Sequence, residues 1–83
     1  MFIQPTLPFE VRAKRYRDAH AWRVSEHRSV VAAMTSLRST ISGRKHRLAG
    51  LETAYIWCSR DNHNYSLHRA AELHAEGHFE GIN

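Results

Sequence analysis

The stretch that decides the fold runs from residue 9 to residue 41 and reads FEVRAKRYRDAHAWRVSEHRSVVAAMTSLRSTI. It contains neither proline nor glycine, since Pro8 precedes it and the next glycine is Gly43. Placed at about 100° per residue, its apolar side chains gather on one broad face, which is typical of an amphipathic helix. The side chains on this face are Phe9, Ala13, Tyr16, Val24, Val30, Val31, Met34, Leu37 and Ile41. The pattern predicts helix through most of the stretch, with Gly43 as the C-terminal cap.

One unbroken helix over this stretch would be too long for a chain of 83 residues. At about 1.5 Å per residue it would extend for about 50 Å, whereas a compact domain of this size has a radius of gyration of about 12 Å. A break at Ser25 resolves the conflict, because serine is a good N-cap and Glu26 then lies in the first turn, where a negative charge is favoured. We therefore expect one helix near residues 9–23 and a second near residues 26–42.

The second half of the chain has shorter signals. Residues 44–58 repeat at helical spacing, with Leu48, Leu51 and Tyr55 on one face. The run from Ala54 to Cys58 is also suited to a short strand, because aromatic and β-branched residues favour that state. Both structures are kept as alternatives for this segment.

A turn and a last helix are expected after this segment. Residues 61–64, Asp-Asn-His-Asn, have the composition of a turn. Asn64 or Ser66 can cap a helix that follows, and Gly77 ends it.

Together these segments predict an all-α fold, a small bundle of three or four helices. The prediction is a single helical domain over residues 1–83. Within it, residues 1–8 form an extended lead-in because they hold Pro5 and Pro8, and residues 78–83 form a frayed tail.

Basic side chains outnumber acidic ones by 12 to 8, which gives a net charge of +4. They form two clusters, one over residues 12–17 and one at Arg44, Lys45 and Arg47, just after Gly43. Three fixed charges within four residues suit a phosphate backbone or an acidic protein surface. The alternative is structural, because basic residues near a helix C-terminus offset its dipole.

Trp22 lies with Arg15 and Val11 on a second stripe, away from the main apolar face of the expected helix. A tryptophan beside an arginine is typical of an interaction hot spot, although burial of the helix on two sides would give the same stripe. The candidate partner-binding residues are Arg12, Arg15, Trp22, Arg44, Lys45 and Arg47.

Four side chains in the second half raise the question of a metal site: Cys58, His63, His74 and His78. Their spacing is similar to that of a zinc finger in which histidine replaces the second cysteine. Gly77 should end the helix before His78, however, so the last two histidines are not held on one helix face. We expect no metal site and no cofactor.

Catalytic motifs are weak throughout the chain. Residues 61–64 with His68 resemble fragments of a histidine-based nuclease site, but the strand hairpin that positions such residues is not evident. Cys58 follows Trp57 in an apolar run, which predicts an inert thiol, and no glycine-rich phosphate loop is found. We expect a protein that is not an enzyme.

The longest apolar runs hold five residues each, at residues 30–34 and 54–58, against about 20 for a membrane-spanning helix. No membrane contact is therefore expected. The single cysteine and the lack of a secretory signal pattern in the first residues predict a cytoplasmic protein.

Three classes of function fit these features. We favour a small protein-binding regulator or inhibitor, of the phage accessory type, that acts on a larger host or defence enzyme. Its partner would be a larger protein or nucleoprotein with an acidic surface. The alternative is a basic helical module that binds nucleic acid through phosphate contacts, and a minimal metal-dependent enzyme comes third. A second copy of the chain is a further candidate partner, because the predicted core is thin.

Replacing Arg44, Lys45 and Arg47 together with alanine distinguishes the two leading functions. With a nucleic-acid ligand, the slope of log affinity against log salt becomes shallower by about 0.9 for each phosphate that the variant no longer neutralises. With a protein partner, Trp22→Ala weakens binding at least as much as the triple change, because aromatic anchors outweigh charges at the rim of an interface. Tight, salt-sensitive binding of the wild type to unrelated DNA duplexes, unaffected by Trp22→Ala, would contradict the protein-binding hypothesis.

Overall fold

The structure is a computed structural model that describes residues 7–42 and 50–81. Near its start the sequence reads FEVRAK from Phe9 to Lys14, so that apolar and charged side chains alternate. A period of two is that of a strand with one buried face, and β1 (Phe9–Arg15) forms here. Phe9, Val11 and Ala13 are completely buried, which shows which face of β1 meets the core.

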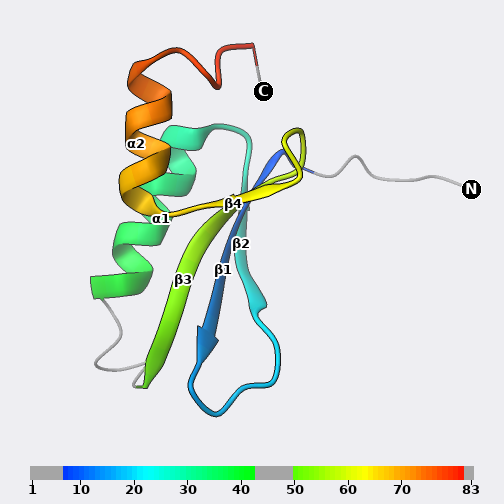
Figure 1. The fold of residues 1–83 in the computed structure, drawn as a ribbon, viewed down its shortest axis with the longest axis vertical. Helices are drawn as coiled ribbons and strands as arrows, with labels where there is room; N and C mark the ends of the chain where they lie inside the picture. The colour runs from blue at the N-terminus through cyan, green and yellow to red at the C-terminus, as the bar shows by residue number, and fades with distance from the viewer. Residues whose placement is uncertain (1–6, 43–49, 82–83) are drawn as a thin grey trace, which may run out of the picture.

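Among the described residues, three further strands join β1 in one antiparallel sheet. β2 (Trp22–His27) pairs with one side of β1, and β3 (Leu51–Cys58) pairs with the other. The short β4 (His63–Tyr65) pairs with the end of β3, which gives the order β2-β1-β3-β4. Figure 1 shows β1 and β3 side by side along most of their length.

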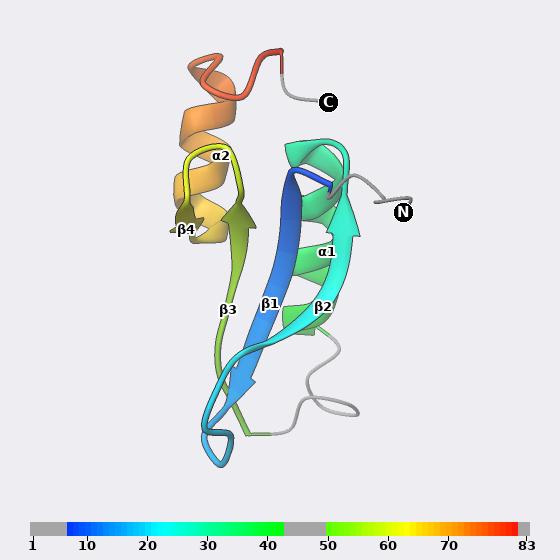
Figure 2. The ribbon, with the colours of Figure 1, turned by 90° about the vertical axis from the view of Figure 1, so that its right-hand side faces the viewer.

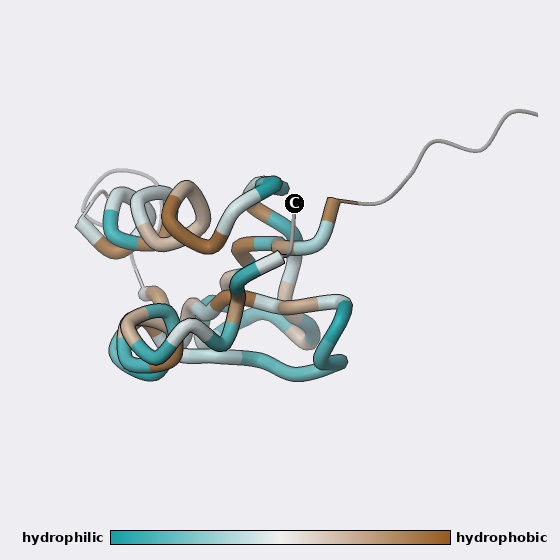
Figure 3. The backbone as a smooth tube through the Cα atoms, turned by 90° about the horizontal axis from the view of Figure 1, so that it is seen from above, coloured by the Kyte–Doolittle hydropathy of each residue, from teal (hydrophilic) through white to brown (hydrophobic). Residues whose placement is uncertain are grey.

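Both helices cover the same face of this sheet. α1 (Val30–Ser42) contacts β1, β2 and β3, while α2 (Leu67–Ala75) contacts β3, β4 and α1. Figure 2 looks onto the opposite face of the sheet, with the helices behind the strands. Figure 3 gives the arrangement from above, coloured by hydropathy.

The core lies between the sheet and the helices, and the segment after α2 closes one end of it. Gly77 has a φ of +81°, a left-handed conformation that glycine adopts without strain, and the chain turns there. Phe79 follows and is only 6% exposed, with its ring edge-on to those of Phe9 and Tyr65 at centroid distances of 5.5 and 5.6 Å. The largest fully buried side chains are Phe9, Leu37, Ile56, Val11 and Cys58.

Serine side chains cap both helices. The Ser29 hydroxyl accepts a hydrogen bond from the backbone N–H of Ala32 at 3.2 Å, just before α1. Ser66 accepts one from the N–H of Arg69 at 3.1 Å, so it is the N-cap of α2 and confirms one of the two caps predicted for the last helix. The predicted Gly43 cap lies outside the described residues.

The expected all-α helical bundle is wrong. Residues 9–23, predicted as a helix, form β1, a turn and the start of β2, and Ser25 lies within β2 rather than at a helix break. The helical projection was misleading, because the apolar side chains Phe9, Ala13 and Tyr16 also recur at helical spacing. Pairing of β1 on both sides satisfies its backbone groups and buries every second side chain, which outweighs the helical period. Residues 51–58 form β3, in agreement with the strand alternative for the run ending at Cys58.

Core substitutions on α1 test this packing. Leu37 is completely buried and Met34 is nearly so, and we expect replacement of either by alanine to lower the free energy of unfolding by about 2 to 4 kcal/mol. Val31, on the same helix, is 51% exposed, so Val31→Ala should change it by only about 0.5 kcal/mol. Urea denaturation of the three variants measures these effects, and equal losses for all three would show that another face of α1 is buried.

Candidate functional site

The sheet face that the helices leave uncovered carries the candidate site. Residues paired directly across an antiparallel sheet point to the same side, so the register of the strands assigns each side chain to a face. Because Val11 and Ile56 are paired and completely buried, their neighbours along each strand point outward. We call this surface the open face, and it consists of Glu10, Arg12, Lys14, Arg23, Glu26, Thr53, Tyr55, Trp57 and Asn64.

Charged and aromatic side chains form two rows across the open face. In the acidic row, Glu10 of β1 lies between Glu26 of β2 and Trp57 of β3. In the basic row, Arg12 lies between Arg23 and Tyr55 on the same two neighbouring strands. Each row therefore has two like charges followed by an aromatic ring.

Arg12, in the basic row, is held in place by two partners from the acidic row. Its guanidinium carbon lies 4.8 Å from the ring centroid of Trp57, within the range of a cation–π interaction. Its Nε donates a hydrogen bond to Glu10 Oε1 at 2.9 Å, and Nη2 lies 2.8 Å from the same oxygen. The Glu10 side chain is only 11% exposed, so this ion pair is shielded from water and positions Arg12 over the indole.

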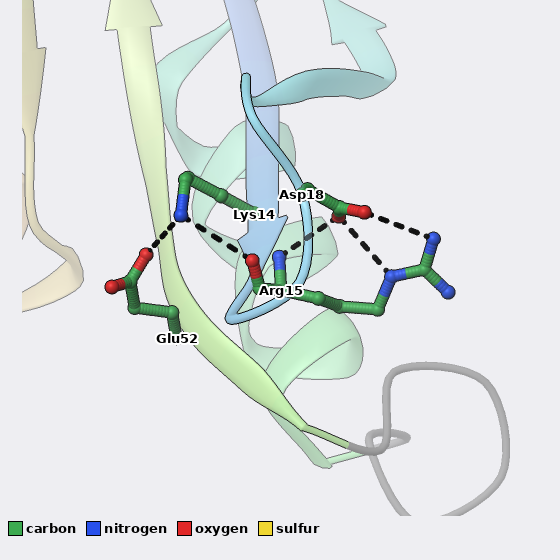
Figure 4. A network of polar contacts seen from close by, with 4 residues as sticks. All are labelled: Lys14, Arg15, Asp18 and Glu52. Atoms are coloured by element: carbon green, nitrogen blue, oxygen red, sulfur yellow. Dashed lines mark hydrogen bonds and ion pairs between the residues drawn. The ribbon is translucent and has the colours of Figure 1, made fainter.

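The other cations of the open face are also paired. Arg23 Nη1 lies 2.7 Å from Glu26 Oε1 and 3.9 Å from Glu10 Oε2. Lys14 forms an ion pair with Glu52 of β3 and donates to the backbone oxygen of Arg15 at 3.4 Å (Figure 4). Each basic side chain of the open face thus has a carboxylate partner, and Glu52, which is not itself a residue of that face, supplies the one for Lys14.

At the β1–β2 turn, Arg15 and Trp22 form a second contact between a cation and an aromatic ring, with the guanidinium carbon 5.1 Å from the ring centroid. Asp18 accepts hydrogen bonds from the backbone N–H of Arg15 at 3.0 Å and from its Nε at 3.2 Å (Figure 4). The backbone hydrogen bond, followed by that from the side chain, lowers the pKa of Asp18 below its ordinary value.

The candidate partner-binding residues that the sequence indicated and the structure describes therefore do not form one site. Arg15 and Trp22 do meet, but across a hairpin rather than along a helix, and Arg12 lies on the open face. Arg44, Lys45 and Arg47 lie outside the described residues. The sequence interpretation missed the roles of Trp57 and Tyr55, although their alternation with buried Ile56 and Cys58 was a usable signal.

A second polar cluster joins the segment after α2 to the turn between β3 and β4. Asp61 Oδ2 accepts a hydrogen bond from the hydroxyl of Tyr65 and lies 2.7 Å from Nε2 of His78, while Oδ1 accepts from Nε of Arg60 at 2.9 Å. Arg60 also donates to the backbone oxygen of His78 at 2.9 Å. Both Asp61 and Arg60 are thus tied to the chain end that carries Phe79.

These contacts shift the pKa values of Asp61 and Tyr65 in opposite directions. Burial alone would raise the pKa of Asp61, but the hydrogen bonds from Arg60, Tyr65 and His78 outweigh it and hold that pKa well below its ordinary range. Burial, followed by the hydrogen bond to Asp61, raises the pKa of Tyr65 to about 12. Asp61 is therefore an anion that stabilises the fold across the neutral range.

The four residues considered for metal binding do not meet at one point, although Cys58 and His63 are cross-strand partners on β3 and β4. Cys58 is completely buried, His74 is exposed on α2, and His78 contacts Asp61. Within residues 7–42 and 50–81, no group of three or more His, Cys, Asp or Glu side chains is placed to hold a metal ion. The fragment resembling a nuclease site is also dispersed, because His68 pairs with Glu72 on α2.

Comparison with known proteins assigns no family, because no family model, curated protein or solved structure matches the chain. In the part of the chain that the structure describes, no helix is long and apolar enough to cross a membrane. The open face is therefore interpreted from its own chemistry.

Substituting Asp61→Asn tests the cluster at the chain end. We expect the free energy of unfolding at pH 7 to fall by about 1 to 3 kcal/mol, because three donors lose a charged acceptor. A carboxyl group whose pKa is lowered in the folded state contributes stability above its unfolded pKa of about 3.9 and loses it as the pH falls further. The difference between wild type and variant should therefore shrink below about pH 4.

Urea denaturation at pH 7 and at acidic pH measures this difference. Glu76→Gln is the control, since Glu76 is exposed and its side chain makes no hydrogen bond to a described residue. A variant at Asp61 that is as stable as wild type at pH 7 would show that the cluster does not hold the chain end.

Proposed function

We propose that the protein is a non-enzymatic, protein-binding regulator that recognises its partner with the open face. The observation that carries this proposal is the stack of Arg12 on Trp57, held by Glu10 on the sheet face that lies opposite α1 and α2. Tryptophan, tyrosine and arginine are the side chains most enriched at binding hot spots. The open face presents all three types next to one another.

The contacts within the open face also favour binding by lowering its entropic cost. A long arginine side chain usually loses rotamer freedom when a partner immobilises it. Arg12 is already fixed by Glu10 and Trp57 before any partner arrives. The surface is therefore preorganised.

Charge balance favours a protein over a nucleic acid as the ligand of this face. Sheets that bind single strands combine aromatic rings with cations that are free to meet phosphates. On the open face, Arg12, Lys14 and Arg23 are each paired with a carboxylate. A phosphate backbone that approached these cations would also meet the carboxylates that lie beside them, Glu10 and Glu26.

The charge of the described residues as a whole agrees with this proposal. Three of the 12 basic residues, Arg44, Lys45 and Arg47, lie outside the described residues, so nine basic residues are set against eight acidic ones in the described part. Most of the excess positive charge thus lies in that one segment. Nucleic-acid binding, the second candidate function, would depend on it.

The sheet edges are less suited to recognition than the face. At the β2 edge the register shifts between Val11 and Arg12, and Val24 is the extra residue in β2. A second shift lies between Lys14 and Arg15, opposite Glu52 of β3. Such irregularities and short edge strands discourage the addition of a further strand. A partner is therefore expected to lie across the face.

Two matched arginine substitutions test the proposed function. The tagged protein is used to capture partners from a nuclease-treated lysate, and the affinity of the captured protein is then measured with purified components. We expect Arg12→Ala to weaken binding by at least about 30-fold, which corresponds to about 2 kcal/mol for a hot-spot residue. Arg38→Ala, on the exposed side of α1, should leave the affinity unchanged.

Trp57→Ala should act like Arg12→Ala, since it removes the ring on which the guanidinium lies. Thermal melts of all variants show whether each still folds. Loss of every partner upon nuclease treatment, or equal capture by folded wild type and both open-face variants, would contradict the proposed function.

A further inference from the structure

The arrangement of charge on the open face indicates one particular protein that fits it. We propose that a second copy of this chain binds there, face to face, related by a two-fold axis that runs across the strands. This inference rests on the proposed function, because it takes the same face to be a protein-binding surface. It goes further by naming the partner.

The two rows make the open face complementary to itself. Glu10 and Arg12 lie two residues apart on β1, which is about 6.7 Å along a strand. Glu26 and Arg23 occupy the same two rows on β2, because the register shift at Val24 absorbs the additional residue. Acidic and basic rows therefore lie parallel to each other across two strands.

A two-fold axis that lies between the two rows, in the plane of the contact, places the acidic row of one copy opposite the basic row of the other. Each strand then lies opposite the same strand of the second copy. Glu10 then meets Arg12 of the second copy, and Glu26 meets Arg23 of the second copy. On β3 the same operation places Trp57 against Tyr55 of the second copy. The first two contacts join carboxylates to guanidinium groups, and the third is an aromatic pair.

The guanidinium groups required for these contacts are available. Arg12 uses Nε and Nη2 on Glu10, while its Nη1 makes no hydrogen bond to any described residue. The side chain of Arg23 is 55% exposed. Both guanidinium groups can therefore bind a second carboxylate without giving up the first.

The same symmetry explains why other occupants fit less well. A nucleic acid carries one sign of charge and would satisfy only the basic row. Two copies of the sheet instead give the aligned stacking seen in β-sandwiches, with about 10 Å between the sheets and the helices on the outside. The second copy would compete with any other protein for the open face, so self-association would regulate access to it.

Charge reversals on β2 test the pairing without disturbing the core. Arg23→Glu places a carboxylate against Glu26 of the second copy, and Glu26→Arg places a guanidinium against Arg23 of the second copy. Like charges in contact disfavour association, so each variant should dimerise at least about tenfold more weakly than wild type. In an equimolar mixture, a mixed dimer brings the two substituted positions together, so that a carboxylate at position 23 faces a guanidinium at position 26. The unchanged Glu26 of one variant faces the unchanged Arg23 of the other. The mixed dimer should therefore form nearly as tightly as the wild-type dimer.

Sedimentation velocity over a range of protein concentrations measures the association, with circular dichroism to show that each variant is folded. Arg38→Glu, on α1, is the control and should dimerise like wild type. A wild type that is monomeric at every concentration, variants that dimerise like wild type, or a mixture that associates no better than either variant alone would each overturn the inference.

The two proposals can fail separately. A monomeric wild type that loses a captured protein partner upon Arg12→Ala overturns the dimer and supports the proposed function. Conversely, a wild type that dimerises, together with variants that regain dimerisation when mixed, supports the two-fold pairing. That result stands even if Arg12→Ala leaves the binding of every other protein unchanged, an outcome that contradicts the proposed function alone.

Discussion

The pairing of β1 with strands on both sides is the constraint on which the rest of the structure depends. Once β1 lies between β2 and β3, its alternating side chains must point to opposite faces of the sheet. Phe9 and Val11 then enter the core under α1, and Glu10 and Arg12 face outward. One strand thus supplies side chains to the centre of the hydrophobic core on one side and to the charged centre of the open face on the other.

The outward face is stabilised by electrostatic pairing instead of by a covering layer. Glu10 is nearly buried there, with Arg12 on its Oε1 at 2.8 Å and Arg23 at 3.9 Å from its Oε2. Leaving a buried carboxylate without these partners would cost more than the pairing contributes, so the three side chains form one unit. This unit positions Arg12 on Trp57, and the candidate site is therefore a consequence of how the open face is stabilised.

Local signals in the sequence were sufficient for the body of α1, for the Ser66 cap of α2 and for the strand alternative at residues 54–58. They placed the start of α1 wrongly, since Ser25 and Glu26 lie in β2 and the helix begins at Val30. They failed at residues 9–23, where alternation and helical spacing coexist and only pairing with distant strands selects between them. The contact of Arg15 with Trp22 was anticipated, although on the wrong element. The open face could not be anticipated, because the register of β1 against β3 brings its side chains together and no short segment encodes that register.

Nuclear Overhauser contacts in solution test the central position of β1 most directly. The account predicts contacts between backbone protons of facing residues on β1 and β3, such as Val11 with Ile56, and contacts of β1 with β2. It also predicts contacts between the side chain of Arg12 and the ring protons of Trp57. A series of contacts between residues three apart along residues 9–23, without contacts across strands, would show a helix there and contradict the account.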